Sequence, residues 1–323
     1  MENKIKKISL IVGSDTGPTR IDRWLKKKFT NIPVSLIHKF IRKKFIKLND
    51  KKTTINNKIV TDDQITISQN WNNCDNKSLK KSVTNISDFR DNLLLILDSV
   101  IYKDDDIIVL NKPCGLAVQG GSKVVISIDD LAEGLKFTFD NKPKLVHRLD
   151  KDTSGILLLA RTARAAQLLA ASFKQKEIIK KYWAIVIGVP QKKSGIIKLP
   201  IAKKNILNSE KTSIDYDNGK VAISKYHVLQ QHASDKLSWL EMLPITGRTH
   251  QLRVHAAAIG TPILGDGKYG RANAFINGYS NKLHLHAREI TIPDFMGKTL
   301  HFTAELPTHM KHTFAQLEFT SKK

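Results

Sequence analysis

The chain has 323 residues and 41% of them are hydrophobic, so it is long enough for two or three domains with packed cores. Its formal net charge of +23 indicates a polyanionic partner, with nucleic acid favoured over an anionic membrane surface. The two cysteines, Cys74 and Cys114, form no CxxC pair, which excludes a zinc ribbon, and no apolar run approaches the roughly 18 residues of a membrane span. We therefore expect a cytoplasmic protein with reduced thiols.

The first 68 residues have the densest basic excess and predict two helices and several short strands. Within residues 19–29 the apolar side chains recur at helical spacing: Ile21, Trp24, Leu25 and Phe29. Pro33 is expected to begin the second helix, because a first-turn residue needs no amide donor. The apolar stripe of that helix consists of Leu36, Ile37, Phe40 and Ile41. Residues 8–13, 45–49 and 64–68 predict short strands.

This arrangement resembles an S4 RNA-binding domain, whose motif is matched by Arg20, Asp22, Leu25, Ser35, Ile41, Arg42 and Asn49. That family usually has glycine after the second helix, where this chain has Lys44. A lysine in the left-handed conformation costs roughly 1 kcal/mol, unless the turn differs. The resemblance implies an S4 domain over residues 18–70 that contacts RNA through Arg20, Lys39, Arg42 and Lys43. The alternative is a basic helical hairpin whose charges only face solvent.

Residues 71–92 are polar, rich in asparagine and without periodicity, so we expect a linker before a second domain over residues 93–323. That second domain is predicted to be mixed and rich in strands. Strands are expected at residues 100–102, 107–110, 143–146, 156–160, 180–188, 237–242, 283–288 and 290–292. Helices are expected at residues 128–139, at 163–173 and after Gly247. The glycine-rich residues 111–121 lack the Gly-Lys-Ser/Thr ending of a phosphate-binding loop.

A polar loop at residues 147–155 lies between two of these predicted strands. Its charged residues are Arg148, Asp150, Lys151 and Asp152. Catalytic groups commonly lie on loops that rigid elements hold on both sides, although an ordinary polar turn has the same composition.

Neither a metal site nor a serine triad is predicted. His250 and His255 are five residues apart, whereas two ligands on one helix face need a spacing of four, and no Glu follows His250. His284 and His286 share one strand face but need further ligands from elsewhere. Ser154 lacks the Gly-x-Ser-x-Gly elbow of the serine hydrolases.

The string His147-Arg148-Leu149-Asp150, followed by residues 152–155, resembles the signature of the RluA-type pseudouridine synthases. The string Lys112-Pro113-Cys114-Gly115 resembles their first motif, and motifs around Tyr182 and Arg253 follow in the family's order. The resemblance implies an α+β fold on a mixed, mainly antiparallel sheet, with the active site in a central cleft and neither a metal nor a cofactor. With an S4 domain on its N-terminal side, the chain resembles the branch of the family that acts on large-subunit (23S) ribosomal RNA. Residues 117–121 and 265–270 favour its RluC type over its RluD type.

The resemblance places the family's nucleophile at Asp150 and its other catalytic groups at Tyr182 and Arg253. Uridine isomerisation breaks the N-glycosidic bond, rotates the detached uracil and joins its C5 to the same sugar carbon, through oxocarbenium-like charge. Asp150 either attacks that carbon or removes the neighbouring 2′ proton, and both routes require an ionised carboxylate in a dry pocket. We expect Arg253 to favour the charged carboxylate as its partner. We expect Tyr182 to stack on the uracil and to assist proton removal from C5.

Two neighbouring residues and two rival functions complete the sequence-based hypothesis. Arg148 is expected to fill the gap left by the extruded base or to bind a flanking phosphate, with support of the loop as the alternative. Asp152 is expected to cap local amides. A non-enzymatic S4-type RNA-binding or ribosome-assembly factor fits the charge but leaves the three catalytic positions unexplained, and a glycosidase needs a second carboxylate. We expect a monomer whose partner is large-subunit ribosomal RNA.

Overall fold

The computed structural model describes residues 8–14, 17–29, 32, 34–68, 86–121, 124–206, 209–232, 234 and 236–320. The chain forms two compact units, Met1–Ile86 and Ser87–Lys323, and each is described by itself. Within the described ranges, every helix is too short or too polar to cross a membrane.

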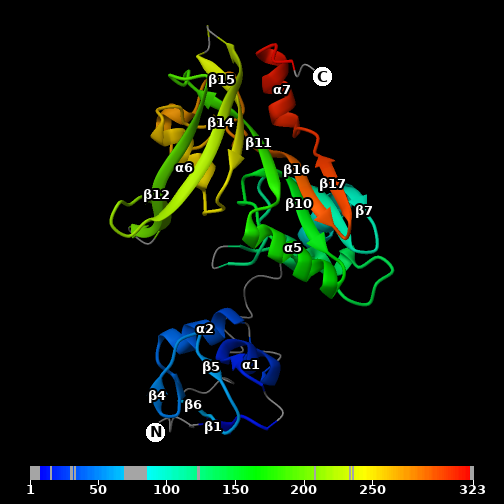
Figure 1. The fold of residues 1–323 in the computed structure, drawn as a ribbon, viewed down its shortest axis with the longest axis vertical. Coiled ribbons are helices and arrows are strands. Elements are labelled where there is room, and N and C mark those ends of the chain that lie inside the picture. Colours follow the sequence, from blue (N-terminus) through cyan, green and yellow to red (C-terminus); the bar gives the residue numbers. More distant parts are fainter. Residues whose placement is uncertain are drawn as a thin grey trace. The chain divides into compact units, whose positions relative to one another are not determined.

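The N-terminal unit packs two helices and several short strands around one core (Figure 1, blue). Helix α1 (Ile21–Lys28) and helix α2 (Val34–Arg42) confirm the two predicted helices. A four-stranded sheet has the order β1 (Ile8–Ile11), β6 (Gln64–Ile67), β3 (Ile46–Leu48), β4 (Lys51–Lys52), and β2 (Thr19–Arg20) pairs with β5 (Lys58–Ile59). The core combines the apolar faces of both helices with the inner faces of the strands: Ile21, Leu25, Ile37, Ile41, Ile46, Ile65 and Ile67.

The turn after α2 has the conformation that a glycine would favour, although it is occupied by a lysine. Lys44 has a φ of 63°, in the left-handed region, at a cost of roughly 1 kcal/mol. Pro33, Trp71, Cys74 and the side chain of Ser35 lie outside the described residues.

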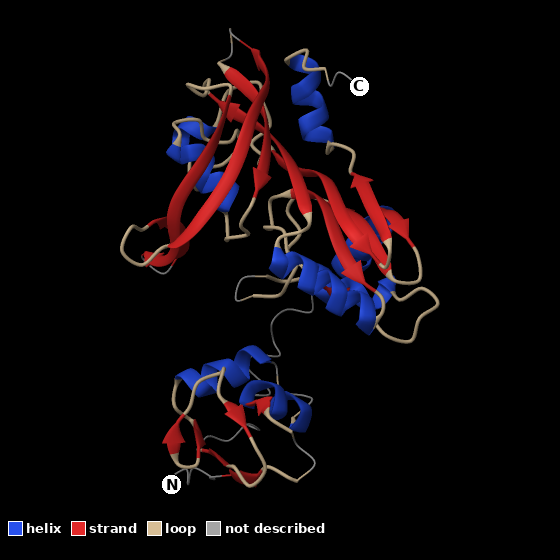
Figure 2. Cartoon of the chain, in the orientation of Figure 1, coloured by secondary structure: helices blue, strands red, loops and turns tan. Residues whose placement is uncertain are grey.

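The second unit is built on an 11-stranded sheet that is mixed and mainly antiparallel (Figures 1 and 2). Its strands are β7 (Val100–Lys103), β8 (Ile107–Lys112), β9 (Lys144–Leu145), β10 (Ser154–Ala160), β11 (Ile179–Ile187), β12 (Ser194–Ile206), β13 (Ser209–Ile214), β14 (Lys220–His232), β15 (Leu237–Pro244), β16 (Leu285–Phe295) and β17 (Lys298–Thr303). The order is β13-β12-β14-β15-β11-β16-β10-β8-β7, with β17 paired to β16 and β9 to β10. Only the β10–β16 pair is parallel among these described strands.

Helices cover the faces of this sheet through separate apolar clusters. Helix α5 (Ala163–Gln175) packs on β8, β10 and β16, and helix α6 (Gln251–Ala258) packs on β11, β14 and β15. Helix α7 (Thr308–Gln316) covers the tryptophans of β11 and β15. Helix α4 (Ile128–Leu131) continues into the 3-10 helix η2 (Ala132–Leu135), and a further 3-10 helix, η3, spans Arg271–Ala274.

Three local predictions require correction. Helix α3 (Ile86–Asp98) includes residues 86–92, which were expected to belong to the linker. Its apolar anchors, Leu93, Ile96 and Leu97, follow that stretch, so residues 71–92 alone showed no periodicity. The helix expected at residues 128–139 ends at Leu135, before the turns around Phe137. The two strands expected at residues 283–288 and 290–292 form one strand, β16.

Gly155 sets the spacing between the two central strands. It has a φ of 105° and pairs with Ala287 of β16, and a Cβ at this position would lie 2.3 Å from the Ala287 carbonyl oxygen. Only glycine therefore lets β10 begin so close to β16, immediately after the loop that contains Asp150.

Candidate active site

The loop that contains Asp150 is held by side chains at both of its ends. At its start, Nε2 of His147 accepts the backbone N–H of Leu158 at 2.8 Å. Burial lowers the pKa of His147 to about 3, so the ring is neutral. At its end, the Ser154 hydroxyl and Nδ1 of His286 form a buried hydrogen bond of 2.9 Å. The loop is thus fixed to β10 and β16 before any substrate arrives.

Lys112 joins the glycine-rich loop to the Asp150 loop. Its fully buried Nζ donates to the carbonyl oxygens of Pro113 at 2.7 Å, Leu116 at 2.8 Å and Lys151 at 2.9 Å. Burial lowers its pKa to about 8. Sequence reasoning gave Lys112 no role of its own, although a lysine at the end of an apolar strand was the available signal.

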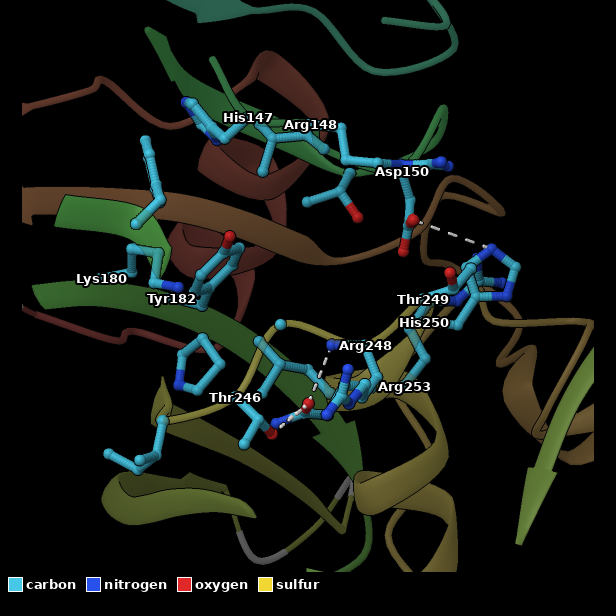
Figure 3. Close-up of a pocket in the computed structure, with 18 of the residues that line it drawn as sticks. His147, Arg148, Asp150, Lys180, Tyr182, Thr246, Arg248, Thr249, His250 and Arg253 are labelled. Carbon is cyan, nitrogen blue, oxygen red and sulfur yellow. Dashed lines mark hydrogen bonds and ion pairs between the residues drawn. The ribbon is translucent and has the colours of Figure 1, made fainter. Parts of the chain in front are cut away.

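A pocket of about 380 Å³ brings the three predicted catalytic residues together (Figure 3). Asp150 comes from the loop before β10, Tyr182 from β11 and Arg253 from α6. Asp150 is the one carboxylate among the described lining residues. The basic lining residues are Arg148, Lys174, Lys176, Lys180, Arg248 and Arg253. Because basic side chains surround the single carboxylate, the pocket favours an anionic ligand.

Opposing effects act on the ionisation of Asp150. Burial raises the pKa of its carboxyl group, while the guanidinium groups of Arg253 and Arg148 and the backbone N–H of His250 lower it, so that the net shift is upward. Burial and the nearby Asp150 charge raise the pKa of the Tyr182 hydroxyl, which therefore keeps its proton at neutral pH. A carboxylate and a phenol perturbed in one pocket are typical of a catalytic site.

The direct partner of Arg253 is Asp266, whereas Asp150 was the expected one. The Arg253 Nε donates to Asp266 Oδ2 at 2.8 Å and its Nη2 donates to Asp266 Oδ1 at 2.6 Å, with both side chains buried. This bidentate pair occupies one edge of the guanidinium, so Arg253 acts on Asp150 by its charge, without a direct ion pair. Sequence reasoning missed Asp266 because residues 265–270 were used only to choose between the RluC and RluD types.

His250 is a second residue that sequence reasoning left without a catalytic role. It precedes α6 in the left-handed conformation, with φ 53° and ψ 21°. Its Nε2 lies 3.9 Å from Oδ1 of Asp150 (Figure 3). Its Nδ1 lies 2.7 Å from the Tyr269 hydroxyl. Left-handed backbone at a residue other than glycine is unusual and often marks a functional position.

The predicted RNA-binding residues differ in their exposure to solvent and in whether an acidic side chain already pairs with them. Lys39, Arg42 and Lys43 are exposed at the end of α2. Arg20 donates to Asp22 through Nε at 3.0 Å and Nη2 at 2.7 Å, so part of its guanidinium is engaged. Arg148 belongs to the other unit and is an exposed residue that lines the pocket.

Two of the histidines that were considered as metal ligands, His284 and His286, form hydrogen bonds within the core. His284 Nε2 and the Thr313 hydroxyl lie 2.9 Å apart, and His286 contacts Ser154 and the carbonyl oxygen of Ala304. Among the described residues, no group of three or more His, Cys, Asp or Glu side chains is arranged to hold a metal ion.

Known proteins are similar to this chain in sequence and in fold. The family described as RNA pseudouridylate synthase matches residues 106–258. A Rickettsia typhi protein named Ribosomal large subunit pseudouridine synthase C is 39% identical over 303 residues, covering 90% of this chain and 94% of that protein. A Buchnera aphidicola protein of the same name is 32% identical over 318 residues, covering 97% and 98%. The solved structure of Human RNA Pseudouridylate Synthase Domain Containing 4 has a TM-score of 0.60 and 28% identity, covering 72% of this chain and 97% of that one. The chain therefore belongs to the RNA pseudouridylate synthase family.

Proposed function

We propose that the protein isomerises specific uridines of large-subunit (23S) ribosomal RNA to pseudouridine, with Asp150 as its nucleophile. The observation that carries the proposal is the pocket, in which a single carboxylate lies among basic side chains and beside a half-buried tyrosine. The ribosomal substrate is supported by the names of the Rickettsia and Buchnera relatives.

Asp150 begins the reaction at the sugar. Its carboxylate either forms a bond to C1′ as the C1′–N1 bond breaks, or removes the 2′ proton as that bond breaks, and the electrons of the broken bond leave with the uracil. The positive charge of Arg253 and Arg148 favours the ionised carboxylate against the effect of burial. Because Asp266 fixes Arg253, that charge is in place before substrate binds.

Tyr182 contributes to the second half of the reaction. After the uracil has rotated and its C5 has bonded to C1′, the C5 proton must leave. Because the Tyr182 hydroxyl is protonated, it accepts that proton only while passing its own proton on. The released Asp150 is the one carboxylate among the described lining residues to receive it.

We propose that the N-terminal unit is an S4-type RNA-binding domain over residues 18–70. The linker that follows ends by residue 85, because helix α3 begins at Ile86. Support for the S4 assignment comes from the exposed side chains of Lys39 and Arg42 on α2 and of Lys43 directly after it. Arg20 is the weakest member of the proposed RNA-binding set because it is paired with Asp22. Arg148, exposed at the pocket, is placed to contact the RNA beside the target nucleotide.

The site geometry argues against a glycosidase. Both glycosidase mechanisms need two carboxyl groups at the scissile bond. Asp152 lines a different pocket from Asp150, together with Cys114 and Lys282. A non-enzymatic RNA-binding factor is not favoured either, because family membership accounts for the Asp150, Tyr182 and Arg253 constellation. A ribosomal substrate also favours a cytoplasmic protein, and we propose that it acts as a monomer.

The test is to map pseudouridines in ribosomal RNA from cells that lack the protein. We expect specific pseudouridines to disappear from the large-subunit RNA, to return with the wild-type gene, and not to return with Asp150→Asn. An unchanged pseudouridine map of the large-subunit RNA contradicts the ribosomal substrate. If pseudouridines disappear from another class of RNA instead, that RNA is the substrate.

A further inference from the structure

His250 and Tyr269 form a connected pair beside Asp150, and the family assignment leaves both without a role. His250 presents two groups to the Asp150 carboxylate, its backbone N–H and its ring Nε2. The backbone N–H reaches the carboxylate from a residue with φ 53°. That left-handed conformation costs roughly 1–2 kcal/mol for a residue other than glycine. The surrounding contacts must therefore hold it in place.

The partners of the two ring nitrogens determine which of them holds the proton of His250. The Nε2 of His250 faces the Asp150 carboxylate, which in its ionised form only accepts hydrogen bonds. A proton on Nε2 leaves Nδ1 as an acceptor, so the Tyr269 hydroxyl, 2.7 Å away, donates to it. Burial, followed by the charges of Arg253 and Lys268, lowers the pKa of His250 to about 3. The neutral ring therefore holds its single proton on Nε2, the atom that faces Asp150.

The Tyr269 ring is itself held in place. Its backbone N–H donates to Oδ1 of Asp266 at 3.2 Å, and the Arg253 guanidinium lies 5.2 Å from its ring centroid. One buried carboxylate, Asp266, thus fixes both Arg253 and Tyr269, the two residues whose effects converge on Asp150.

We propose that Tyr269 and His250 are a positioning pair that directs the Nε2–H of His250 at the Asp150 carboxylate, and that this contact shortens to a hydrogen bond when the target nucleotide fills the pocket. The present separation of 3.9 Å is longer than a hydrogen bond. Catalytic hydrogen bonds are often long without substrate and tighten in the complex. The inference rests on the proposed function, because it assigns the pair to the nucleophile of that reaction.

The pH dependence of kcat, which reports the pKa of Asp150 in the enzyme–RNA complex, tests the pair. The charged or titratable groups that act on Asp150 are Arg253 in α6, His250 directly before α6, Arg148 and Asp152 on its own loop, Tyr182 on β11 and Lys112 on β8. Tyr269→Phe leaves all of these groups in place and removes only the hydroxyl that fixes the His250 tautomer. We expect the acid limb of the profile to move up by about one pH unit, as for the loss of one hydrogen bond to a charged group.

A second variant separates the ring from the backbone. His250→Gly keeps the left-handed conformation without strain and removes only the imidazole. We expect it to move the acid limb in the same direction as Tyr269→Phe. Tyr226→Phe, which removes a hydroxyl from a buried tyrosine on β14 outside the pocket, is the matched control and should leave the limb unchanged.

Nitrogen NMR of the histidine rings in the full chain supplies a readout independent of activity. We expect His250 to be protonated on Nε2 in the wild type and to become a mixture of tautomers in Tyr269→Phe. An acid limb that stays at the wild-type pH in both variants, whatever the loss of rate, overturns the proposal. An Nδ1-protonated ring in the wild type also overturns it. If the wild type itself forms no pseudouridine, the proposed function fails. An acid limb that does not move in the variants refutes only the positioning pair, so the two failures can be told apart.

Discussion

Replacing Asp266 by asparagine tests how strongly the buried Arg253–Asp266 pair supports the catalytic unit. Arg253 and Asp266 are 6% and 1% exposed, and two short hydrogen bonds join them. Asparagine keeps the shape of the side chain but removes its charge and turns one acceptor into a donor that faces the guanidinium. Leaving a buried charge without its partner costs about 3–5 kcal/mol. At about 2–4 °C per kcal/mol for a unit of this size, we expect the melting temperature to fall by roughly 6–20 °C.

The assay is thermal and denaturant unfolding of the full chain, followed by signals from the tryptophans of the second unit, Trp183 and Trp239. Asp217→Asn, at an exposed turn, is the matched control and should change stability by less than about 0.5 kcal/mol. Replacing both partners, Arg253→Met with Asp266→Leu, should recover much of the stability, because no buried charge remains. A single Asp266→Asn variant that loses less than about 1 kcal/mol, or a double variant no more stable than the single one, refutes this reasoning.

Three further predictions concern lysines. Lys112→Met should lower the free energy of unfolding by roughly 2–4 kcal/mol, because three carbonyl oxygens lose their shared donor; an unchanged denaturation midpoint argues against it. In an Asp150→Asn background, Lys180→Met should weaken RNA binding and lower the salt slope by about 0.7–0.9, since Lys180 lines the pocket without an ion pair. Lys181→Met is its control, because Lys181 pairs with Glu241 and Glu289; equal effects of the two changes contradict the assignment. Changing Lys39, Arg42 and Lys43, the exposed charges at the end of α2, to Gln should lower the slope of RNA affinity against salt concentration by up to about 2–3. Changing Lys51, Lys52 and Lys58 to Gln is the control and should not lower the slope in this way.

The α+β class and the mainly antiparallel sheet were predictable from the sequence, because they depend on local patterns and on recognisable motifs. Family membership and the structure confirm both predictions. The limits of elements were less predictable. Helix α3 begins inside a polar stretch because its apolar side chains pack only from Leu93 onward, against strands that are distant in sequence.

Within the site, the identities of candidate residues were more accessible than their partners. Asp150, Tyr182 and Arg253 are on separate motifs, and the structure places all three at one pocket. Their roles stay predictions. The partner of Arg253 was not predictable, because Asp266 follows a helix and a turn whose path the sequence does not specify. The left-handed backbone of His250 has no local signal either, since it depends on the contact with Tyr269 and on the junction with α6.

The central claim is that isomerisation of uridine depends on the Asp150 carboxylate. Release of tritium from RNA labelled at C5 of uridine measures it directly, because that hydrogen leaves only when C5 has bonded to the sugar. The full-length wild-type chain should release tritium from large-subunit RNA. Asp150→Asn should reduce the rate on the order of 10⁴-fold or more, with RNA binding largely kept. An Asp150→Asn protein that binds the RNA and still releases tritium at a rate near that of the wild type contradicts the account.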